Sequence, residues 1–146
     1  MISNLKRDLR RLISQRVSNL SPSSILEQSQ IVANQVLEAL NLENRPLNIS
    51  VYLAMPSELS TKPLLEELFA MNLERQEAIS VFVPKVFGPD RHSMVMIPIQ
   101  SMEEVESFPL NKWGIPEPVL DERDVRLEDF EWDLDAVIVP GVAFSR

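Results

Sequence analysis

The sequence predicts an α/β domain of three layers, in which a largely parallel sheet is flanked by helices. Segments with helical periodicity alternate with short strand-like apolar segments along the chain. A continuous apolar run, Ala136–Val139, is bounded by acidic residues and by Pro140-Gly141, which is typical of a strand buried on both faces. With 146 residues and a hydrophobic fraction of 45%, we expect one globular domain over residues 1–146.

Two long helices are predicted at the start of the chain. Apolar residues recur there at steps of three and four, which indicates an amphipathic helix over residues 3–18. Ser21-Pro22 then has the pattern of an N-cap followed by proline in the first helical position, and this second helix should end near Leu42. Ser24 with Glu27 offers an alternative capping box for the same helix.

The remaining elements follow from alternation, proline breaks and capping patterns. Alternating apolar residues predict strands, and proline or a serine cap marks where most elements begin or end. In order along the chain we expect a strand at 49–53, a helix from Thr61 to Met71, a strand at 78–83 stopped by Pro84, a strand at 95–99, a short helix capped by Ser101 with Glu104, and an ordered loop at 108–118.

Composition excludes several classes of partner. The net charge of −8 argues against nucleic acid, because binding to a polyanion needs a concentrated basic surface. No apolar run approaches the roughly 20 residues that a membrane span requires. The chain has no cysteine and His92 is its one histidine, so it offers neither a thiolate metal site nor a multi-histidine site.

The compartment is predicted from the same composition. Absence of cysteine fits a reducing environment, so we expect a cytoplasmic location. We also expect a monomer. The alternative is a mitochondrial location, since the basic and serine-containing amphipathic start has the composition of a presequence.

The first helix carries a candidate anion site. On a helical wheel Lys6 and Arg10 lie one turn apart at one border of the apolar stripe, whereas Arg7 and Arg11 fall on the far side. Two cations at this spacing suit a phosphate or a carboxylate tail. The alternative is a solvated basic face, which charge spacing alone favours.

Other candidate ligand contacts follow the predicted strands. Ligands of parallel sheets bind beyond the carboxyl ends of the strands, which here means 55–58, 84–85 and 140–141. Glu58 could accept N–H groups of a heterocycle there, or be an ordinary surface glutamate. Trp113, with the methionines, could form the apolar wall for a flat ring or simply belong to the core.

Several segments, taken in order, resemble the 5-formyltetrahydrofolate cyclo-ligase family. Six motifs of the family have counterparts in this chain, in the same order. The first three are K-R-x-L-R at 6–10, a strand and loop ending in glutamate at 51–58, and a P-[KR] step at 83–85. The other three are a methionine-containing strand at 94–96, a W-[GN]-I-x-[EQ]-P loop at 113–118, and D-x-[IV]-x-[VM]-P-G-x-[AG]-F at 135–144. Each motif is weak alone, but together they span most of the chain.

The resemblance implies an ATP-dependent ring closure. ATP phosphorylates the formyl oxygen of 5-formyltetrahydrofolate, N10 attacks the activated carbon, and phosphate leaves to give 5,10-methenyltetrahydrofolate. The implied cofactors are ATP and Mg²⁺, the ion neutralising the phosphates. The implied partner is the folate substrate, with or without a polyglutamate tail.

Site residues are carried over from the family motifs by position. Lys6, Arg7, Asp8, Leu9 and Arg10 would contact ATP, and Arg10 would also face the folate. Leu53 and Glu58 would bind the folate, the glutamate by accepting hydrogen bonds from the pterin. Three residues of the matching segments would line the site: Lys85, toward ATP, and Met94 and Trp113, toward the folate.

The sequence departs from the family pattern after Phe144. The family continues through a segment resembling G-x-R-L-G-x-G-x-G-Y-Y-D, whereas here only Ser145 and Arg146 follow. That segment supplies phosphate contacts and a magnesium-ligand aspartate, so we expect no metal ligand in this chain and an uncovered edge strand at 137–139. The alternative function is therefore a folate-binding variant without catalysis.

Overall fold

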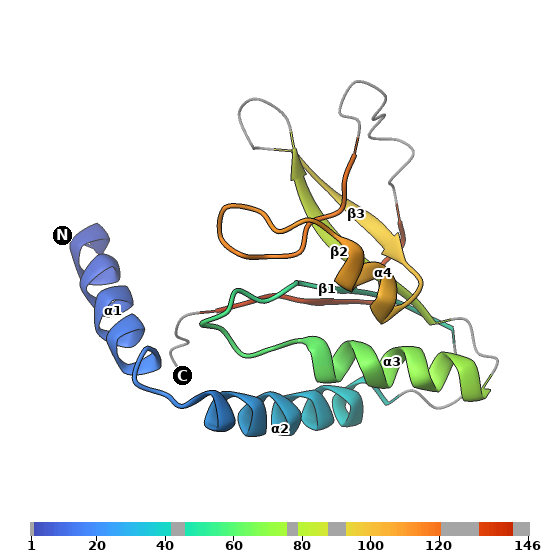
Figure 1. The fold of residues 1–146 in the computed structure, drawn as a ribbon, viewed down its shortest axis with the longest axis horizontal. Coiled ribbons are helices and arrows are strands. Elements are labelled where there is room, and N and C mark those ends of the chain that lie inside the picture. Colours follow the sequence, from blue (N-terminus) through green and yellow to red (C-terminus); the bar gives the residue numbers. More distant parts are fainter. Residues whose placement is uncertain (1, 42–45, 76–78, 88–92, 121–131, 142–146) are drawn as a thin grey trace.

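The computed structural model describes residues 2–41, 46–75, 79–87, 93–120 and 132–141. Two helices come first, and strands and helices then follow one another along the chain, with α4 between the last two strands (Figure 1). In order, the elements are α1 (Ile2–Val17), α2 (Pro22–Leu40), β1 (Leu47–Val51), α3 (Lys62–Arg75), β2 (Ile79–Phe87), β3 (Ser93–Ile99), α4 (Met102–Ser107) and β4 (Ala136–Ile138).

The four strands form one mixed sheet in the order β3-β2-β1-β4. β1 lies parallel to β2, with Leu47 opposite Ile79 and Ser50 opposite Phe82, and it also lies parallel to β4. β2 and β3 are antiparallel. The predicted α/β fold with a largely parallel sheet and helices is confirmed.

The main core lies between the sheet and helices α2, α3 and α4. Alternate residues of β1 and β2 point toward these helices because strand side chains alternate between the two faces. Removal of these branched apolar side chains from water is the main stabilising term for such a layer. The most buried members of this core are Leu47, Ile49, Val51, Leu64, Leu65, Leu68, Val81 and Val83.

A smaller aromatic contact lies on the opposite face of the sheet. Phe82, the neighbour of two core residues in β2, is buried there, and its ring centroid is 4.9 Å from that of Trp132. Trp132 also donates from Nε1 to the carbonyl of Met96 in β3, at 3.0 Å. The indole therefore satisfies its polar atom while it covers an apolar part of the sheet.

The helix caps agree with the sequence. Ser21 is the N-cap of α2, and its hydroxyl accepts from the N–H of Ser24 at 3.1 Å. Ser101 caps α4 in the same way through Glu104, at 3.2 Å. The alternative cap at Ser24 is not used, because Ser24 lies inside the first turn. α2 ends at Leu40, and Leu42 is outside the described residues.

Pro84 does not end β2, so that prediction was wrong. The strand continues to Phe87, with Pro84 opposite Met96 of β3. β1 pairs with β2 only as far as Phe82, so beyond it β2 has no neighbour on that side among the described strands. A residue without an N–H is tolerated at such an edge position.

β4 also differs from its prediction. The prediction of a strand buried on both faces was wrong for the described structure, since β4 is the last strand of the sheet and Val137 is 49% exposed. Its apolar run nevertheless forms a strand, because it pairs in parallel with Ile49–Val51. The expected uncovered edge is therefore present among the described residues.

Helix α1 stands apart from the sheet in Figure 1, on the side toward which β1 runs. From Asn4 to Val17 all of its residues are exposed except Ile13 and Val17, which are half-buried. Its apolar stripe, including Leu5, Leu9 and Leu12, is not covered by other described residues. Among the described residues, no helix has the length and apolar character needed to cross a membrane.

Candidate functional site at the carboxyl edge of the sheet

A tight turn follows β1 at residues 55–58. The N–H of Glu58 donates to the carbonyl of Met55 at 2.9 Å, and the Glu58 carboxylate accepts from the N–H of Met55, also at 2.9 Å. The half-buried side chain thus closes its own turn through Oε2. A carboxylate has about four acceptor positions, so Glu58 retains capacity for donors of a ligand.

Tyr52, just before this turn, is influenced by the same carboxylate. Burial raises the pKa of the Tyr52 hydroxyl above its ordinary value, and the negative charge of Glu58 raises that pKa further. The hydroxyl makes a long hydrogen bond of 3.4 Å to the carbonyl of Leu59, and the Tyr52 carbonyl accepts from Thr61 Oγ1 at 2.7 Å. These bonds connect the end of β1 to the start of α3.

The predicted loop at 108–118 is ordered around Asn111. Its Oδ1 accepts from the N–H groups of Trp113, at 2.9 Å, and Ile115, at 3.1 Å. The backbone N–H of Asn111 donates to the Ile115 carbonyl at 2.9 Å, and that of Gly114 donates to the Asn111 carbonyl at 2.9 Å. Asparagine at the first position of a four-residue turn, with glycine at the fourth, favours such a turn, because the asparagine side chain can bond to the backbone within it.

An ion pair connects this loop to β2. Lys85 Nζ contacts Glu117 Oε1, and the other Glu117 oxygen accepts from Asn111 Nδ2 at 2.8 Å. The side chains of Lys85 and Glu117 are 14% and 27% exposed, so solvent screens this pair less than a surface pair. The predicted ligand contact Lys85 therefore lies against the same loop that carries Trp113.

The loop also touches the 55–58 turn. Gly114 has φ +76°, and a Cβ added to it would lie 3.4 Å from Pro56 Cγ. Glycine suits both the left-handed backbone and the close approach. This contact brings the Trp113 loop next to the turn that carries Glu58.

Two shallow pockets adjoin these loops. One, of about 270 Å³, is lined by Lys85, Asn111 and Glu117 together with apolar residues of 109–120. The other, of about 260 Å³, includes Leu53, Pro116 and the start of α3. Leu53 is half-buried against the core, so it forms part of a pocket wall while supporting the sheet.

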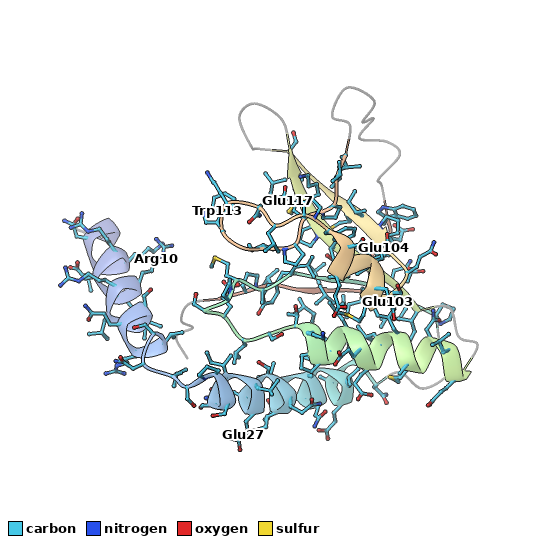
Figure 2. All side chains as sticks on the ribbon, in the orientation of Figure 1. Arg10, Glu27, Glu103, Glu104, Trp113 and Glu117 are labelled. Atoms are coloured by element: carbon cyan, nitrogen blue, oxygen red, sulfur yellow. The ribbon has the colours of Figure 1, made fainter. Side chains whose placement is uncertain are left out.

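Trp113 and Met94 are both available at the surface. Trp113 is 51% exposed, and Lys112 Nζ lies 4.3 Å from its ring centroid (Figure 2). Met94 is 55% exposed in β3, opposite Val86. Because Val86 is adjacent to Lys85 in β2, its side chain and that of Met94 lie on the opposite face of the sheet from Lys85. Met94 is thus at the same end of the sheet but is not brought together with the Lys85 pair.

The predicted ATP residues are on α1. Lys6, Arg7, Asp8, Leu9 and Arg10 are all exposed, and within the described residues the cations make no ion pair. Figure 2 shows Arg10 on α1, separate from the loop that carries Trp113 and Glu117. The three cations among them suit a polyanionic ligand, since no carboxylate of the described structure pairs with them.

No metal ligand is assigned. The described ranges contain no group of three or more His, Cys, Asp or Glu side chains that could hold a metal ion. His92 lies outside these ranges.

Comparison with known proteins identifies the family. Residues 2–146 match the 5-formyltetrahydrofolate cyclo-ligase family. The chain belongs to the 5-formyltetrahydrofolate cyclo-ligase family. Its match covers both the Trp113 loop and the 55–58 turn that the structure brings into contact.

Two relatives align with nearly the whole chain. A protein of Schizosaccharomyces pombe described as a probable 5-formyltetrahydrofolate cyclo-ligase is 36% identical over 142 residues, which cover 97% of this chain and 63% of the relative. A mouse protein described as 5-formyltetrahydrofolate cyclo-ligase is 30% identical over 146 residues, covering 99% of this chain and 67% of the relative. The chain thus spans 63% and 67% of the lengths of these relatives.

A solved structure supports the fold. The NMR structure of 5,10-methenyltetrahydrofolate synthetase from Aquifex aeolicus superposes with a TM-score of 0.63 at 24% identity, over 95% of this chain and 62% of that one. The order of elements described above is therefore that of a known fold.

Sequence reasoning missed Asn111 and did not assign Glu117 a role. Both form side-chain bonds that organise the site loop. The signal for Asn111 was present, because Asn followed closely by Gly is a turn pattern. No local signal marks Glu117, whose ionic partner is 32 residues away.

Proposed function

We propose that the protein to which this chain belongs converts 5-formyltetrahydrofolate to 5,10-methenyltetrahydrofolate, with hydrolysis of ATP to ADP and phosphate. The observation that carries the proposal is the convergence of family-motif residues at the carboxyl edge of the sheet: the 55–58 turn with Glu58, the loop with Trp113, and Lys85. Ligands of α/β proteins bind at this edge.

The folate is assigned to the two loops. Glu58 accepts N–H groups of the pterin with the acceptor capacity that its bond to Met55 leaves. Leu53 supplies apolar contact, and Trp113 offers a large exposed ring for a flat ligand. Arg10 is a further contact assigned by the family motif. Met94 is assigned by its position at this end of the sheet alone, since it lies on the opposite face from Lys85.

The nucleotide is assigned to basic residues. Lys6, Arg7 and Arg10, within the segment 6–10, hold the phosphates, and Lys85 contributes a further cation beside the loop. When bound, Mg-ATP supplies the phosphoryl group that activates the formyl oxygen. The chain's own contribution is to orient the folate and to keep cations near the developing charge.

A second candidate is a folate-binding protein without turnover. It is supported by the turn at 55–58, where Glu58 keeps acceptor positions beside its bond to the Met55 N–H, and binding of a pterin there requires no ATP. The two functions share the folate contacts and differ in the use of ATP.

One experiment separates the two. The purified chain is melted with and without 5-formyltetrahydrofolate, and formation of the methenyl product is followed by absorbance after Mg-ATP is added. A rise in melting temperature together with product supports catalysis, whereas a rise without product supports the second candidate. Glu58→Gln should weaken folate binding about tenfold, the worth of one hydrogen bond to a charged group.

The matched control is Glu27→Gln, on the exposed face of α2. It should leave folate binding unchanged. No response of the melting temperature to the folate in the folded wild-type chain would contradict both functions for this chain. The cytoplasmic location, the monomeric state and the single domain remain predictions from the sequence.

A further inference from the structure

Both polar atoms of the Asn111 side chain have protein partners. Oδ1 accepts two backbone N–H groups, those of Trp113 and Ile115, at 2.9 and 3.1 Å. Nδ2 donates to Glu117 at 2.8 Å. These three bonds are all internal to the protein, so they act on a ligand through the shape that they give to the loop.

Glu117 connects that loop to the sheet. One carboxylate oxygen accepts from Asn111 and the other contacts Lys85 of β2. Its backbone N–H donates to the carbonyl of Pro109 at 2.9 Å, which closes the base of the loop. A charge-assisted bond in a partly shielded position is stronger than a neutral one, so this pair is the main polar link between the loop and β2.

Asn111 and Glu117 affect the proposed folate contacts indirectly, through the position of the loop. The turn that Asn111 closes presents Gly114 to Pro56, and thereby sets the loop beside the turn of Glu58. The ion pair to Glu117 also fixes the ammonium group of Lys85. Loss of either bond would let the Trp113 loop and the ammonium group of Lys85 move relative to the sheet.

We propose that Asn111 and Glu117 are positioning residues, which hold the Trp113 loop against β2 at the carboxyl edge of the sheet, so that Trp113 is set for the folate and the Lys85 ammonium group for the nucleotide. The inference rests on the proposed function and adds two residues to it. Prearranged contacts bind more tightly, because the ligand does not have to order the loop on binding.

The first test uses the ligand-free chain. Hydrogen exchange of the Trp113 and Ile115 amides is measured by NMR in the wild type, in Asn111→Ala and in the control Asn34→Ala, whose amide accepts a surface hydrogen bond from Gln30 on α2. Exchange at the two loop amides should rise about tenfold in Asn111→Ala alone. Unchanged exchange, or an equal rise at sheet amides such as that of Val81, would overturn the proposal.

The second test measures the affinity for 5-formyltetrahydrofolate. Glu117→Gln keeps an acceptor for Asn111 but removes the charge that faces Lys85, and binding should weaken about fivefold to tenfold. The control is Glu66→Gln, which removes a surface ion pair with Lys62 at 3.8 Å and should leave affinity unchanged.

The outcomes distinguish this inference from the function on which it rests. A wild-type chain that does not bind the folate overturns the proposed function, whatever the exchange result. Normal wild-type binding with unchanged affinity in both Asn111→Ala and Glu117→Gln overturns the positioning role alone. The positioning role is also overturned if the control variants lose as much affinity and fall as far in melting temperature as Asn111→Ala and Glu117→Gln.

Discussion

The carboxylate of Asp135 accepts a hydrogen bond from the backbone N–H of Asn48, with 2.8 Å between Oδ2 and N. The Asp135 N–H donates in return to the Asn48 carbonyl at 2.8 Å, and the Asn48 side chain donates to the carbonyl of Asp133 at 2.9 Å. These three bonds join β1 to the start of β4 across more than 80 residues of sequence. They add to the pairing of β4 with Ile49–Val51 in holding this three-residue strand at the sheet edge.

Asp135→Ala should therefore destabilise the chain by about 1–2 kcal/mol, because it removes a charged acceptor of a backbone N–H. For a chain of this size that corresponds to a fall in melting temperature of roughly 3–6 °C. Thermal melting followed by circular dichroism measures it. Asp133→Ala is the matched control, since Asp133 contributes only its backbone carbonyl to this set and should change the melting temperature little.

Ser29 is the second stability prediction. Its side chain is 1% exposed, donates to the carbonyl of Ile25 at 2.6 Å and accepts from the N–H of Ser60 at 2.9 Å. Ser29→Ala leaves that N–H without its partner, which costs about 1–3 kcal/mol. Urea unfolding should show a lower midpoint with an unchanged slope. Ser23→Ala, at the exposed start of α2, should leave the midpoint nearly unchanged.

Local signals predicted most of the helices and strands. Ser21 and Ser101 cap helices with side chains that reach only three residues along the chain, so their sequence patterns were sufficient. The prediction for Pro84 was wrong because a strand tolerates proline where its neighbour stops pairing with it. The point at which β1 stops pairing with β2 depends on tertiary structure. The exposure of Val137 likewise depends on the position of β4 at the sheet edge, and not on the apolar run itself.

The candidate site was only partly predictable. Glu58, Leu53, Lys85 and Trp113 were found by resemblance to a family, and their neighbourhood agrees with the rule that ligands bind at carboxyl edges. The bonds that hold the site were not predictable, since Glu117 and Lys85 are far apart in sequence.

Gly114→Ala should disturb the contact between the two site loops. At φ +76° a side chain costs roughly 1–2 kcal/mol, and the new Cβ would press on Pro56 at 3.4 Å. We expect a fall in melting temperature of a few degrees together with weaker binding of 5-formyltetrahydrofolate. Glu27→Ala is the control, because Glu27 is exposed on α2 and lies away from both site loops in Figure 2. Equal effects of both variants on binding would contradict the special role of Gly114.

The basic residues of α1 should affect nucleotide binding without affecting stability. Lys6 and Arg10 are exposed and make no ion pair with the described residues, so their replacement by alanine removes no packing. We expect the double variant to keep the wild-type melting temperature within about 1 °C and to lose most of the additional shift produced by Mg-ATP. Arg16→Ala is the control for charge alone. A loss of the shift in the control would indicate a nonspecific electrostatic effect.

Tyr52 should make stability fall at alkaline pH. Burial, and secondly the charge of Glu58, raise the pKa of Tyr52 above 10.0, so the hydroxyl ionises in the unfolded chain before it ionises in the folded one. The stability associated with the neutral hydroxyl is complete below pH 10 and is lost as the pH rises from there through the folded pKa. The free energy of unfolding should therefore drop more steeply above pH 10 in the wild type than in Tyr52→Phe, which has no proton to lose. Urea unfolding at several pH values from 8 upward measures the difference, and parallel curves for the two proteins would show that the environment of Tyr52 does not disfavour its ionised form.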